Sequence, residues 1–420
     1  MNQTDVLTDK AKEKKNWMNT FLKKQVLKQL AQISDSYLSL KTPGESYQFG
    51  DVQSDLSANI TIYDERFFQH VAFQGSVGAA ESYIDGDWET EDLTKLIQVF
   101  VRNRDLLDQM EGGVASFKNA LLKVGHFFNK NTLDGSRKNI AQHYDLGNDL
   151  FELFLDSKMM YSSAVYLSPE DSLEEASERK LRIICEKLQL KPEDKVIEIG
   201  TGWGGFALFA AQKYGCHVTT TTISDEQYQY TLNQIKALGL ENKITLLKRD
   251  YRLLKGQYDK LVSIEMIEAV GHHYLQTYLQ KCNDLLKPDG LALIQAITIE
   301  DHRYLMALKS VDFIKKYIFP GSFIPSVGAI LEANAKSTEM KLVNLEDFGE
   351  SYAYTLRDWH QRFNQQTELL AERGYGKAFR RMWRFYFSYC EGGFLERAIS
   401  DVHLMFAKPA NRRASILAYK

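Results

Sequence analysis

The stretch that decides the fold runs from Lys195 to Gly205 and reads K-V-I-E-I-G-T-G-W-G-G. An apolar run with strand character ends there in a glycine-rich turn, and a helical pattern begins at Phe206. Such a turn places backbone N–H groups and a helix N-terminus against a bound cofactor. The sequence therefore predicts a site for a cofactor that contains a nucleoside.

Predicted strands and helices alternate from Asn139 onward. This alternation is typical of an α/β fold with a parallel, doubly wound sheet. A mostly helical region follows Glu300 and is too long for a loop, so we expect it to form a lid over the C-terminal edge of the sheet. The predicted strands are Val196–Ile199, His217–Ile223, Ile244–Leu247, Lys260–Ile264 and Leu291–Ile299, and the predicted helices are Phe206–Tyr214, Asp225–Leu238 and His273–Leu286.

The chain before residue 120 is predicted to form a separate, small α+β domain. Its first 33 residues have a helical pattern, whose apolar face either packs on its own domain or docks on an anionic lipid surface. Strand-like alternation follows over residues 44–75. The predicted segments are the strands Asn59–Tyr63 and Val71–Phe73, the helix Leu93–Arg102, a linker over residues 121–138, a cofactor-binding domain over 139–420 with the lid at about 300–385, and a basic tail from Lys408.

Composition limits the classes of function. The net charge of -3 over 420 residues gives no positive field of the kind that binds nucleic acid. No run of about 18 apolar residues is present, and the N-terminus lacks an apolar signal core. The cysteines Cys185, Cys216, Cys282 and Cys390 lie far apart, which favours reduced thiols in the cytoplasm over disulfides or a metal site.

The glycine-rich turn fits two cofactors. Gly200, Gly202 and Gly205 satisfy the G-x-G-x-x-G pattern of dinucleotide sites. With Glu198 and Gly204, the same turn satisfies the E/D-x-G-x-G pattern of class I methyltransferases. The turn alone does not choose between them.

Two later strands favour S-adenosylmethionine (SAM). An NAD site needs a carboxylate on the ribose at the end of the second strand, and this strand ends T-T-I-S at Ser224. Asp250 follows the third strand, where methyltransferases place an acid that accepts from the adenine amino group. The sequence therefore predicts SAM as the cofactor.

An ordered series of segments carries a family resemblance from about residue 138 to 407. The series resembles the cyclopropane-fatty-acyl-phospholipid synthases and the related mycolic acid cyclopropane synthases. This implies a Rossmann-like class I methyltransferase sheet with a helical lid. The segments are Q-H-Y-D-L-G-N-D-L-F-E-L-F-L-D from Gln142, M-Y-S-S-A-V-Y from Met160, E-I-G-T-G-W-G-G from Glu198, T-I-S-D-E-Q from Thr222, R-D-Y from Arg249, M-I-E-A-V-G from Met266, K-Y-I-F-P-G from Lys316 and F-Y-F-S-Y-C-E-G-G-F from Phe385.

The resemblance implies transfer of a methylene group from SAM to a cis double bond in a phospholipid acyl chain, through methyl transfer, a carbocation and loss of a proton. Such a site should exclude water and present aromatic faces to the cation. Tyr144 and Tyr161 are implied to lie beside the substrate. The residues implied to hold SAM are Tyr161, Ser162, Gly200, Gly202, Ile223, Gln227, Asp250 and Tyr251.

The family's base is thought to be a bound bicarbonate ion. The residues at its site here are Ser163, Glu268, Gln295, Ile297 and Tyr352, of which Ser163 and Gln295 replace a Cys and a His. Both can still donate hydrogen bonds, but Gln295 cannot carry a proton as His could. Glu268 is therefore expected either to orient the bicarbonate or to act as the base itself.

Three further features leave alternatives open. Glu265 stands where cyclopropane synthases often carry Gly and where related N-methyltransferases carry Glu, so an amine substrate remains an alternative, as does a methyl-branched lipid product. Cys390 matches a family cysteine with either a catalytic or a structural role. The basic residues around Arg381 either bind phospholipid headgroups or form a solvated helix face. The expected partners are a membrane phospholipid, the inner face of the membrane and a second copy of the chain.

Overall fold

The structure is a computed structural model, and it describes residues 18–105 and 147–412. The chain divides into two compact units. The N-terminal unit comprises residues 1–125, 310–317 and 367–396, and the large unit comprises the rest of the chain. The predicted domain boundary and linker near residues 120–138 lie outside the described residues.

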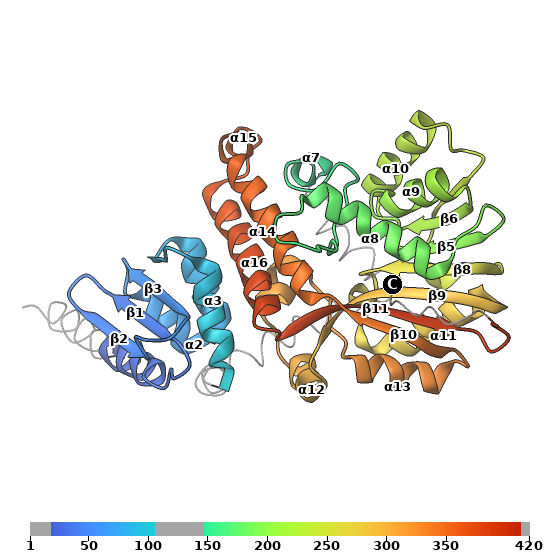
Figure 1. The fold of residues 1–420 in the computed structure, drawn as a ribbon. Helices are drawn as coiled ribbons and strands as arrows, with labels where there is room; N and C mark the ends of the chain where they lie inside the picture. The colour runs from blue at the N-terminus through green and yellow to red at the C-terminus, as the bar shows by residue number, and fades with distance from the viewer. Residues whose placement is uncertain (1–17, 106–146, 413–420) are drawn as a thin grey trace, which may run out of the picture. The chain divides into compact units, whose positions relative to one another are not determined.

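The N-terminal unit contains a four-stranded sheet in the order β2-β1-β3-β4. Its elements agree with the predicted α+β class (Figure 1). The predicted helix Leu93–Arg102 is α3, and Asn59–Tyr63 falls largely on β3. Val71–Phe73 was predicted as a strand, and this is wrong, because these residues belong to helix α2. The elements are a helix over 18–30, β1 (Tyr37–Lys41), β2 (Ser46–Gly50), β3 (Ser57–Ile62), α2 (Arg66–Asp85), β4 (Trp88–Glu89), α3 (Leu93–Arg102), α15 (Thr367–Glu372) and α16 (Lys377–Leu395).

Helix α16 belongs to the N-terminal unit, although the sequence analysis assigned its first half to the lid. Arg381 of this helix is 5% exposed and donates to the backbone oxygens of Tyr83 and Trp88 and to Glu89. Its guanidinium also lies 3.9 Å from the ring centroid of Tyr83. Arg381 therefore ties the helix to its own unit and is not available to bind a headgroup.

The large unit contains a mixed seven-stranded sheet in the order β10-β11-β9-β8-β5-β6-β7. The five strands from β9 to β7 run parallel, and β11 and β10 are antiparallel to their neighbours. All five predicted strands of this sheet are present, which confirms the α/β prediction. The strands are β5 (Lys195–Ile199), β6 (His217–Thr222), β7 (Ile244–Lys248), β8 (Tyr258–Ile264), β9 (Leu286–Ile299), β10 (Lys341–Asp347) and β11 (Ile399–Ala407).

Strands β10 and β11 lie in or just after the region that was predicted to be mostly helical. They do not belong to a helical lid but complete the seven-stranded sheet. The last seven residues of β11 are all buried, so its sequence lacks the alternation that marks a half-exposed strand. The helical elements of this region in the large unit are α12 (Asp301–Lys309), α13 (Val327–Ser337) and α14 (Gly349–Gln365).

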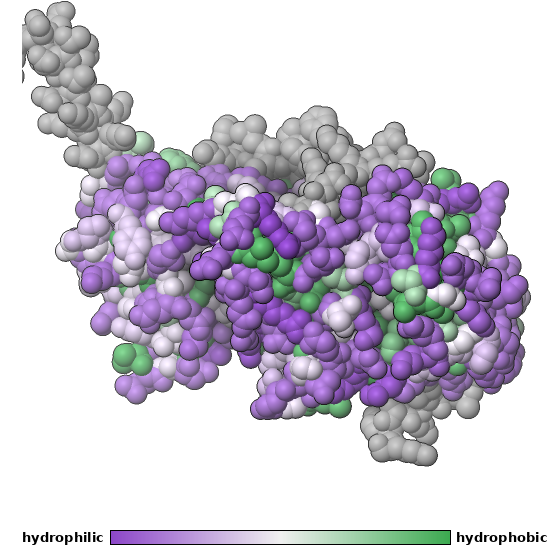
Figure 2. Space-filling view, turned by 90° about the horizontal axis from the view of Figure 1, so that it is seen from above, coloured by the Kyte–Doolittle hydropathy of each residue, from purple (hydrophilic) through white to green (hydrophobic). Residues whose placement is uncertain are grey.

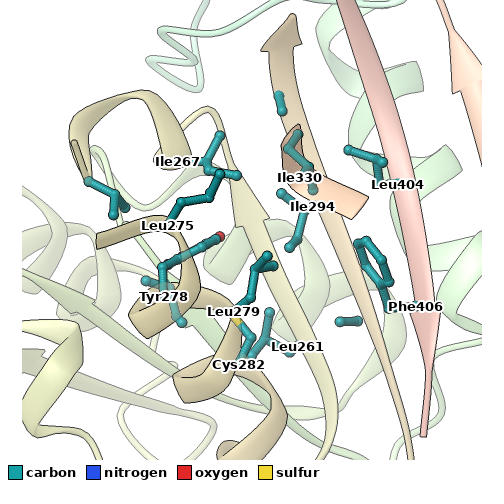
Figure 3. Packing of buried hydrophobic residues seen from close by; sticks show 14 of the residues in the cluster. Leu261, Ile267, Leu275, Tyr278, Leu279, Cys282, Ile294, Ile330, Leu404 and Phe406 are labelled. Carbon is teal, nitrogen blue, oxygen red and sulfur yellow. The ribbon is translucent and has the colours of Figure 1, made fainter. Parts of the chain in front are cut away.

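Apolar cores cover both faces of the large sheet. One face packs against α11 (Leu275–Leu285) and α13, and Figure 3 shows Leu275, Leu279 and Cys282 directed toward the strands. The other face packs against α8 (Leu173–Leu188) and α9 (Gly205–Tyr214). Strands β5, β6, β8 and β9 are therefore largely buried on both sides, which explains the apolar runs of β5, β8 and β9, while β6 buries a run of threonines.

The surface of the described residues is largely polar. Figure 2 shows hydrophilic residues over most of one face, with small hydrophobic areas between them. Leu305 and Met306 of α12 are among the exposed large hydrophobic residues. Within the described ranges, no helix combines the length and the apolar character needed to span a membrane.

Candidate active site

The glycine-rich turn joins β5 to α9 at the carboxyl edge of the parallel strands. Gly202 has a φ of 53°, and a Cβ built there would meet nothing within 4 Å. Gly204 has a φ of 90°, and a Cβ there would lie 2.8 Å from Cγ2 of Thr231. Close packing behind Gly204 and open space beside Gly202 suit a turn that a cofactor approaches from one side.

The other predicted SAM residues follow the same strand edge. Ile223 comes directly after β6, and Gln227 lies in the first turn of α10 (Asp225–Ala237). Asp250 and Tyr251 follow β7. Because β5, β6 and β7 are parallel neighbours, their carboxyl ends lie on one edge of the sheet. The chain thus brings the predicted SAM residues of three strands to one place, and their individual contacts with SAM stay predictions.

Asp250 is held in place by Arg252. The carboxylate is 4% exposed and accepts from Nε of Arg252 at 2.9 Å and from its Nη2 at 2.7 Å. It also accepts from the backbone N–H of Arg252 at 2.9 Å, so the carboxylate is fixed just after β7, where an acid for the adenine amino group was predicted. The residues present at this turn therefore fit an adenosine-containing cofactor.

Tyr161 lies in an aromatic cluster. Its ring centroid is 5.1 Å from that of Phe151, 5.3 Å from that of Trp359 and 6.3 Å from that of Phe319. Trp359 also makes an edge contact with the ring of Tyr352. Aromatic faces stabilise a positive centre and keep water away. The cluster therefore provides the environment that the predicted carbocation needs.

Glu265 is the centre of the hydrogen-bond network. Its Oε1 accepts from the backbone N–H of Ser163 at 2.7 Å and from Nε2 of Gln295 at 2.8 Å. Its Oε2 accepts from the hydroxyl of Tyr352 at 2.7 Å. Burial raises the pKa of Glu265, whereas these donors and the positive charge of Lys180 oppose that rise.

The backbone at Glu265 is unusual for a residue with a side chain. Its φ of 46° lies in the left-handed region, which costs a non-glycine residue about 1–2 kcal/mol. The turn that follows β8 would accept glycine without this cost. A strained residue at a buried polar site points to a functional side chain.

Glu268 lies on the short 3-10 helix η2 (Ile267–Ala269). Its Oε1 accepts from the backbone N–H of Ile297 at 2.6 Å, and its Oε2 is buried without a hydrogen-bond partner. Burial and the negative charge of Glu265 raise the pKa of Glu268 to about 8. Glu268 is therefore mostly protonated at neutral pH, unlike a carboxylate that is ready to accept a proton.

The predicted bicarbonate site does not fit an added anion. The donors expected to hold it include groups of Ser163, Gln295 and Tyr352, and all three residues already donate to the carboxylate of Glu265. The hydroxyl of Ser163 donates to the backbone oxygen of Ala164. A second anion would therefore meet a negative charge and a set of donors that are already in use.

Several residues of the network were not predicted from the sequence. Gln295 also donates to Asp401 and contacts His403, both on β11. Lys180 of α8 is fully buried. The residue before each of Asp401 and His403 is apolar or small, so nothing in the local pattern marks a site. The helix that carries Lys180 was not predicted either, so Lys180 could not be recognised as a lysine on a buried helix face.

Two predicted residues are not part of this network. Tyr144 lies outside the described residues. Cys390 lies on α16 in the N-terminal unit, and burial together with the charge of Asp312 raises the pKa of its thiol above its usual value. A thiol in this state is a poor nucleophile.

Comparisons with known proteins identify the family that shares this sequence and architecture. Residues 131–404 match the family of mycolic acid cyclopropane synthetases. Tuberculostearic acid methyltransferase UfaA1 of Mycobacterium tuberculosis is 36% identical over 78% of this chain and 77% of its own length. Cyclopropane-fatty-acyl-phospholipid synthase of Escherichia coli is 36% identical over 85% and 90%. The cyclopropane synthase MmaA2 of Mycobacterium tuberculosis superposes with a TM-score of 0.60 and 26% identity over 65% of this chain and 98% of that chain.

The fold and the turn after β5 define a class I, SAM-dependent methyltransferase. Within that class, the chain belongs to the mycolic acid cyclopropane synthetase family, whose members modify lipids. The resemblance stated from the sequence is thereby confirmed, as is the Rossmann-like sheet.

Proposed function

We propose that the protein forms a cyclopropane ring on the cis double bond of a phospholipid acyl chain. When bound at the turn after β5, SAM supplies an electrophilic methyl group to one alkene carbon, which leaves positive charge on the other. The rings around Tyr161 stabilise that charge and exclude water. A proton then leaves the transferred methyl group, and the C–H electron pair closes the ring.

Glu265 is the base in this proposal. Burial raises the pKa of Glu265, but the charge of Lys180 and three hydrogen-bond donors oppose that rise and support the ionised form. Glu268 has the backbone N–H of Ile297 as its donor, and its pKa of about 8 leaves it mostly protonated at neutral pH. The observation that carries the proposal is therefore the carboxylate of Glu265 held by groups of Ser163, Gln295 and Tyr352, where the family resemblance implies bicarbonate.

A second candidate product is a methyl-branched lipid. It is favoured by the 36% identity to a protein named for tuberculostearic acid methylation. Both products need the same first step and the same base, because either requires a proton to leave after methyl transfer. In the cyclopropane route, the C–H electron pair of the transferred methyl group bonds to the cationic carbon. In the second route, a hydride first moves to the cationic carbon, so the charge lies on the carbon that bears the methyl group, and proton loss from that methyl gives a methylene-branched alkene. A saturated methyl branch would need a separate reductase to supply hydride.

The proposed function also includes contact with a membrane surface, since the substrate is a phospholipid. The N-terminal unit would serve membrane approach or dimerisation, and the protein would work as a peripheral homodimer at the inner face of the membrane. Vesicle flotation and light scattering of the full chain test these two points.

The deciding experiment is incubation of the full chain with methyl-labelled SAM and vesicles of a monounsaturated phospholipid. A cyclopropane and a methylene-branched alkene have the same mass, so the product must be identified by proton NMR. Cyclopropyl proton signals support the proposal, and vinylidene signals support the second candidate. Label that appears only on added amines would move the function to N-methylation.

A further inference from the structure

Lys180 is a charged side chain in the interior. It lies on the inner side of α8 with 0% of its surface exposed, and its Nζ donates to the hydroxyl of Ser162. Burial lowers the pKa of Lys180, and the carboxylate of Glu265 is the strongest of the groups that oppose that shift. Ser162 precedes Ser163, whose backbone N–H donates to Glu265, so the ammonium of Lys180 reaches the residue next to a donor of the Glu265 network.

Asp401 and Glu265 form a carboxyl pair. Nε2 of Gln295 donates to Oδ2 of Asp401 at 2.7 Å and to Oε1 of Glu265 at 2.8 Å, so one nitrogen holds an oxygen of each. Asp401 is fully buried and Glu265 is partly buried, and two carboxyls this close cannot both be ionised without a cost. The pair therefore shares one proton in the resting protein.

The different surroundings of Glu265 and Asp401 decide which of the two carboxyls holds the shared proton. Glu265 accepts from three donors, whereas Oδ1 of Asp401 is buried without a partner. Asp401 is 0% exposed, and burial and the charge of Glu265 raise its pKa well above the usual range. Hydrogen bonds to the charged form favour ionisation, so the proton resides on Asp401 and the charge on Glu265.

We propose that Lys180 and Asp401 are positioning residues for the base: the ammonium of Lys180 keeps Glu265 ionised, and Asp401 holds the proton of the carboxyl pair. The inference rests on the proposed function, in which Glu265 accepts a proton from the transferred methyl group. Neither residue needs to touch the substrate.

The other titratable groups around Glu265 do not supply the positive charge that Lys180 supplies. Tyr352 of α14 donates as a neutral hydroxyl, and Glu268 of η2 adds a carboxyl with a raised pKa. His403 of β11 lies behind Gln295, and burial together with Lys187 and Lys180 holds its pKa well below the usual value. His403 is therefore neutral and supplies no positive charge.

The first test is the pH dependence of Lys180→Met. Glu265 acts as a base only when it is ionised, so turnover rises with pH through its pKa and then levels. Loss of the ammonium raises that pKa, and the acid limb of kcat should move up by at least about one pH unit, which is about tenfold in rate at a pH below the limb. Turnover should return at high pH. Lys213→Met, at an exposed lysine of α9, should leave the profile in place.

A loss in Lys180→Met that is equal at every pH would overturn the role of Lys180, because a purely structural defect is not restored by raising the pH. SAM affinity measured by calorimetry checks that the variant still folds and binds.

The second test compares Asp401→Asn with Asp401→Ala. Asparagine keeps both a donor toward Glu265 and an acceptor for Gln295, as a protonated aspartic acid does. Asp401→Asn should therefore retain turnover within about threefold, and Asp401→Ala should lose at least tenfold. If Asp401→Asn lost as much turnover as Asp401→Ala, the proton would not reside on Asp401.

A third measurement is independent of turnover. In deuterated buffer at neutral pH, the infrared difference between the wild type and Asp401→Asn should contain the carbonyl band of a protonated carboxylic acid, and Asp289→Asn, at an exposed position, should not show it. Absence of this band overturns the assignment even if the lipid assay succeeds. Conversely, failure of the wild type on every lipid overturns the proposed function and leaves the infrared result to decide the carboxyl pair.

Discussion

The hydroxyl of Tyr352, on α14, donates a hydrogen bond of 2.7 Å to Oε2 of Glu265, in the turn after β8. This bond connects α14, which follows the parallel strands in the sequence, with the turn at the carboxyl end of β8, a central strand of the sheet. Tyr352 was predicted from the family resemblance to hold a bicarbonate ion, and in the structure its hydroxyl donates to a carboxylate of the chain itself. In the proposed function, this carboxylate takes the place of the anion.

Replacement of Tyr352 by Phe removes this donor and leaves the ring. Hydrogen bonds to charged groups contribute about 1.5–3 kcal/mol, so the ionised form of Glu265 should lose stability and its pKa should rise. We expect turnover at neutral pH to fall about tenfold or more and to recover in part at higher pH. The control is Tyr354→Phe on the same helix, whose hydroxyl donates to Glu350 at the surface. Equal losses in both variants would contradict a specific role for Tyr352.

Glu265→Gly tests whether the side chain stands in for a bicarbonate ion. The substitution relieves the positive φ and frees the donors of Ser163, Gln295 and Tyr352. We expect turnover to collapse in buffer freed of bicarbonate and to return in part when bicarbonate is added. Glu265→Gln fills the same space with a neutral group and should not be rescued. A wild type that itself requires bicarbonate would show that Glu265 is not the base.

Asp250→Ala tests the SAM site. Asp250 is 4% exposed and is held by Arg252, so it is oriented to accept from a bound adenine. We expect calorimetry to show SAM affinity lower by about tenfold or more, since a lost buried hydrogen bond costs about 1–3 kcal/mol. The matched control is Asp225→Ala, where the carboxylate is exposed and pairs with Lys248 at the surface. Unchanged affinity in Asp250→Ala would place the adenine elsewhere.

The parallel part of the large sheet could be predicted because its sequence signals are local. Each strand from β5 to β9 contains a short apolar or β-branched run that a turn or helix pattern bounds. β11 could not be predicted in this way, since it is buried on both faces and is inserted beside β9 from more than a hundred residues away. Its place depends on pairing between distant segments, which no local pattern reports. The place of α16 in the N-terminal unit could not be predicted either, because it also depends on contacts between distant segments.

Part of the candidate site could be predicted from contiguous motifs, namely the turn at Gly200 and the residues Glu265 and Glu268. Gln295, Ile297 and Tyr352 lie outside these motifs and were predicted from the family resemblance alone. Lys180, Asp401 and His403 come from a helix and a strand on which nothing marks them as polar site residues, and only the tertiary structure brings them to Gln295 and Glu265. The proposal that Glu265 replaces bicarbonate also needed coordinates, because it depends on which group three donors contact.

Glu268 predicts a pH dependence of stability whose sign follows from its raised pKa. In the folded protein its pKa is about 8 against 4.5 for the free side chain, so the folded state holds this proton where the unfolded state has released it. Stability therefore falls as the pH rises between these values, at about 1.4 kcal/mol per pH unit for a single group. Glu268→Gln keeps the neutral form at every pH and removes this loss.

The free energy of unfolding, measured with urea at pH 5 and at pH 8, should show a stabilising effect of Glu268→Gln that is small at pH 5 and larger by about 2 kcal/mol or more at pH 8. The control is Glu186→Gln on α8, at a side chain that is 61% exposed, where the difference between the two pH values should be near zero. If the effect of Glu268→Gln were the same at both pH values, Glu268 would be ionised in the folded protein throughout this range. It would then compete with Glu265 as the base, and the variant's turnover would have to be measured before either carboxylate is assigned.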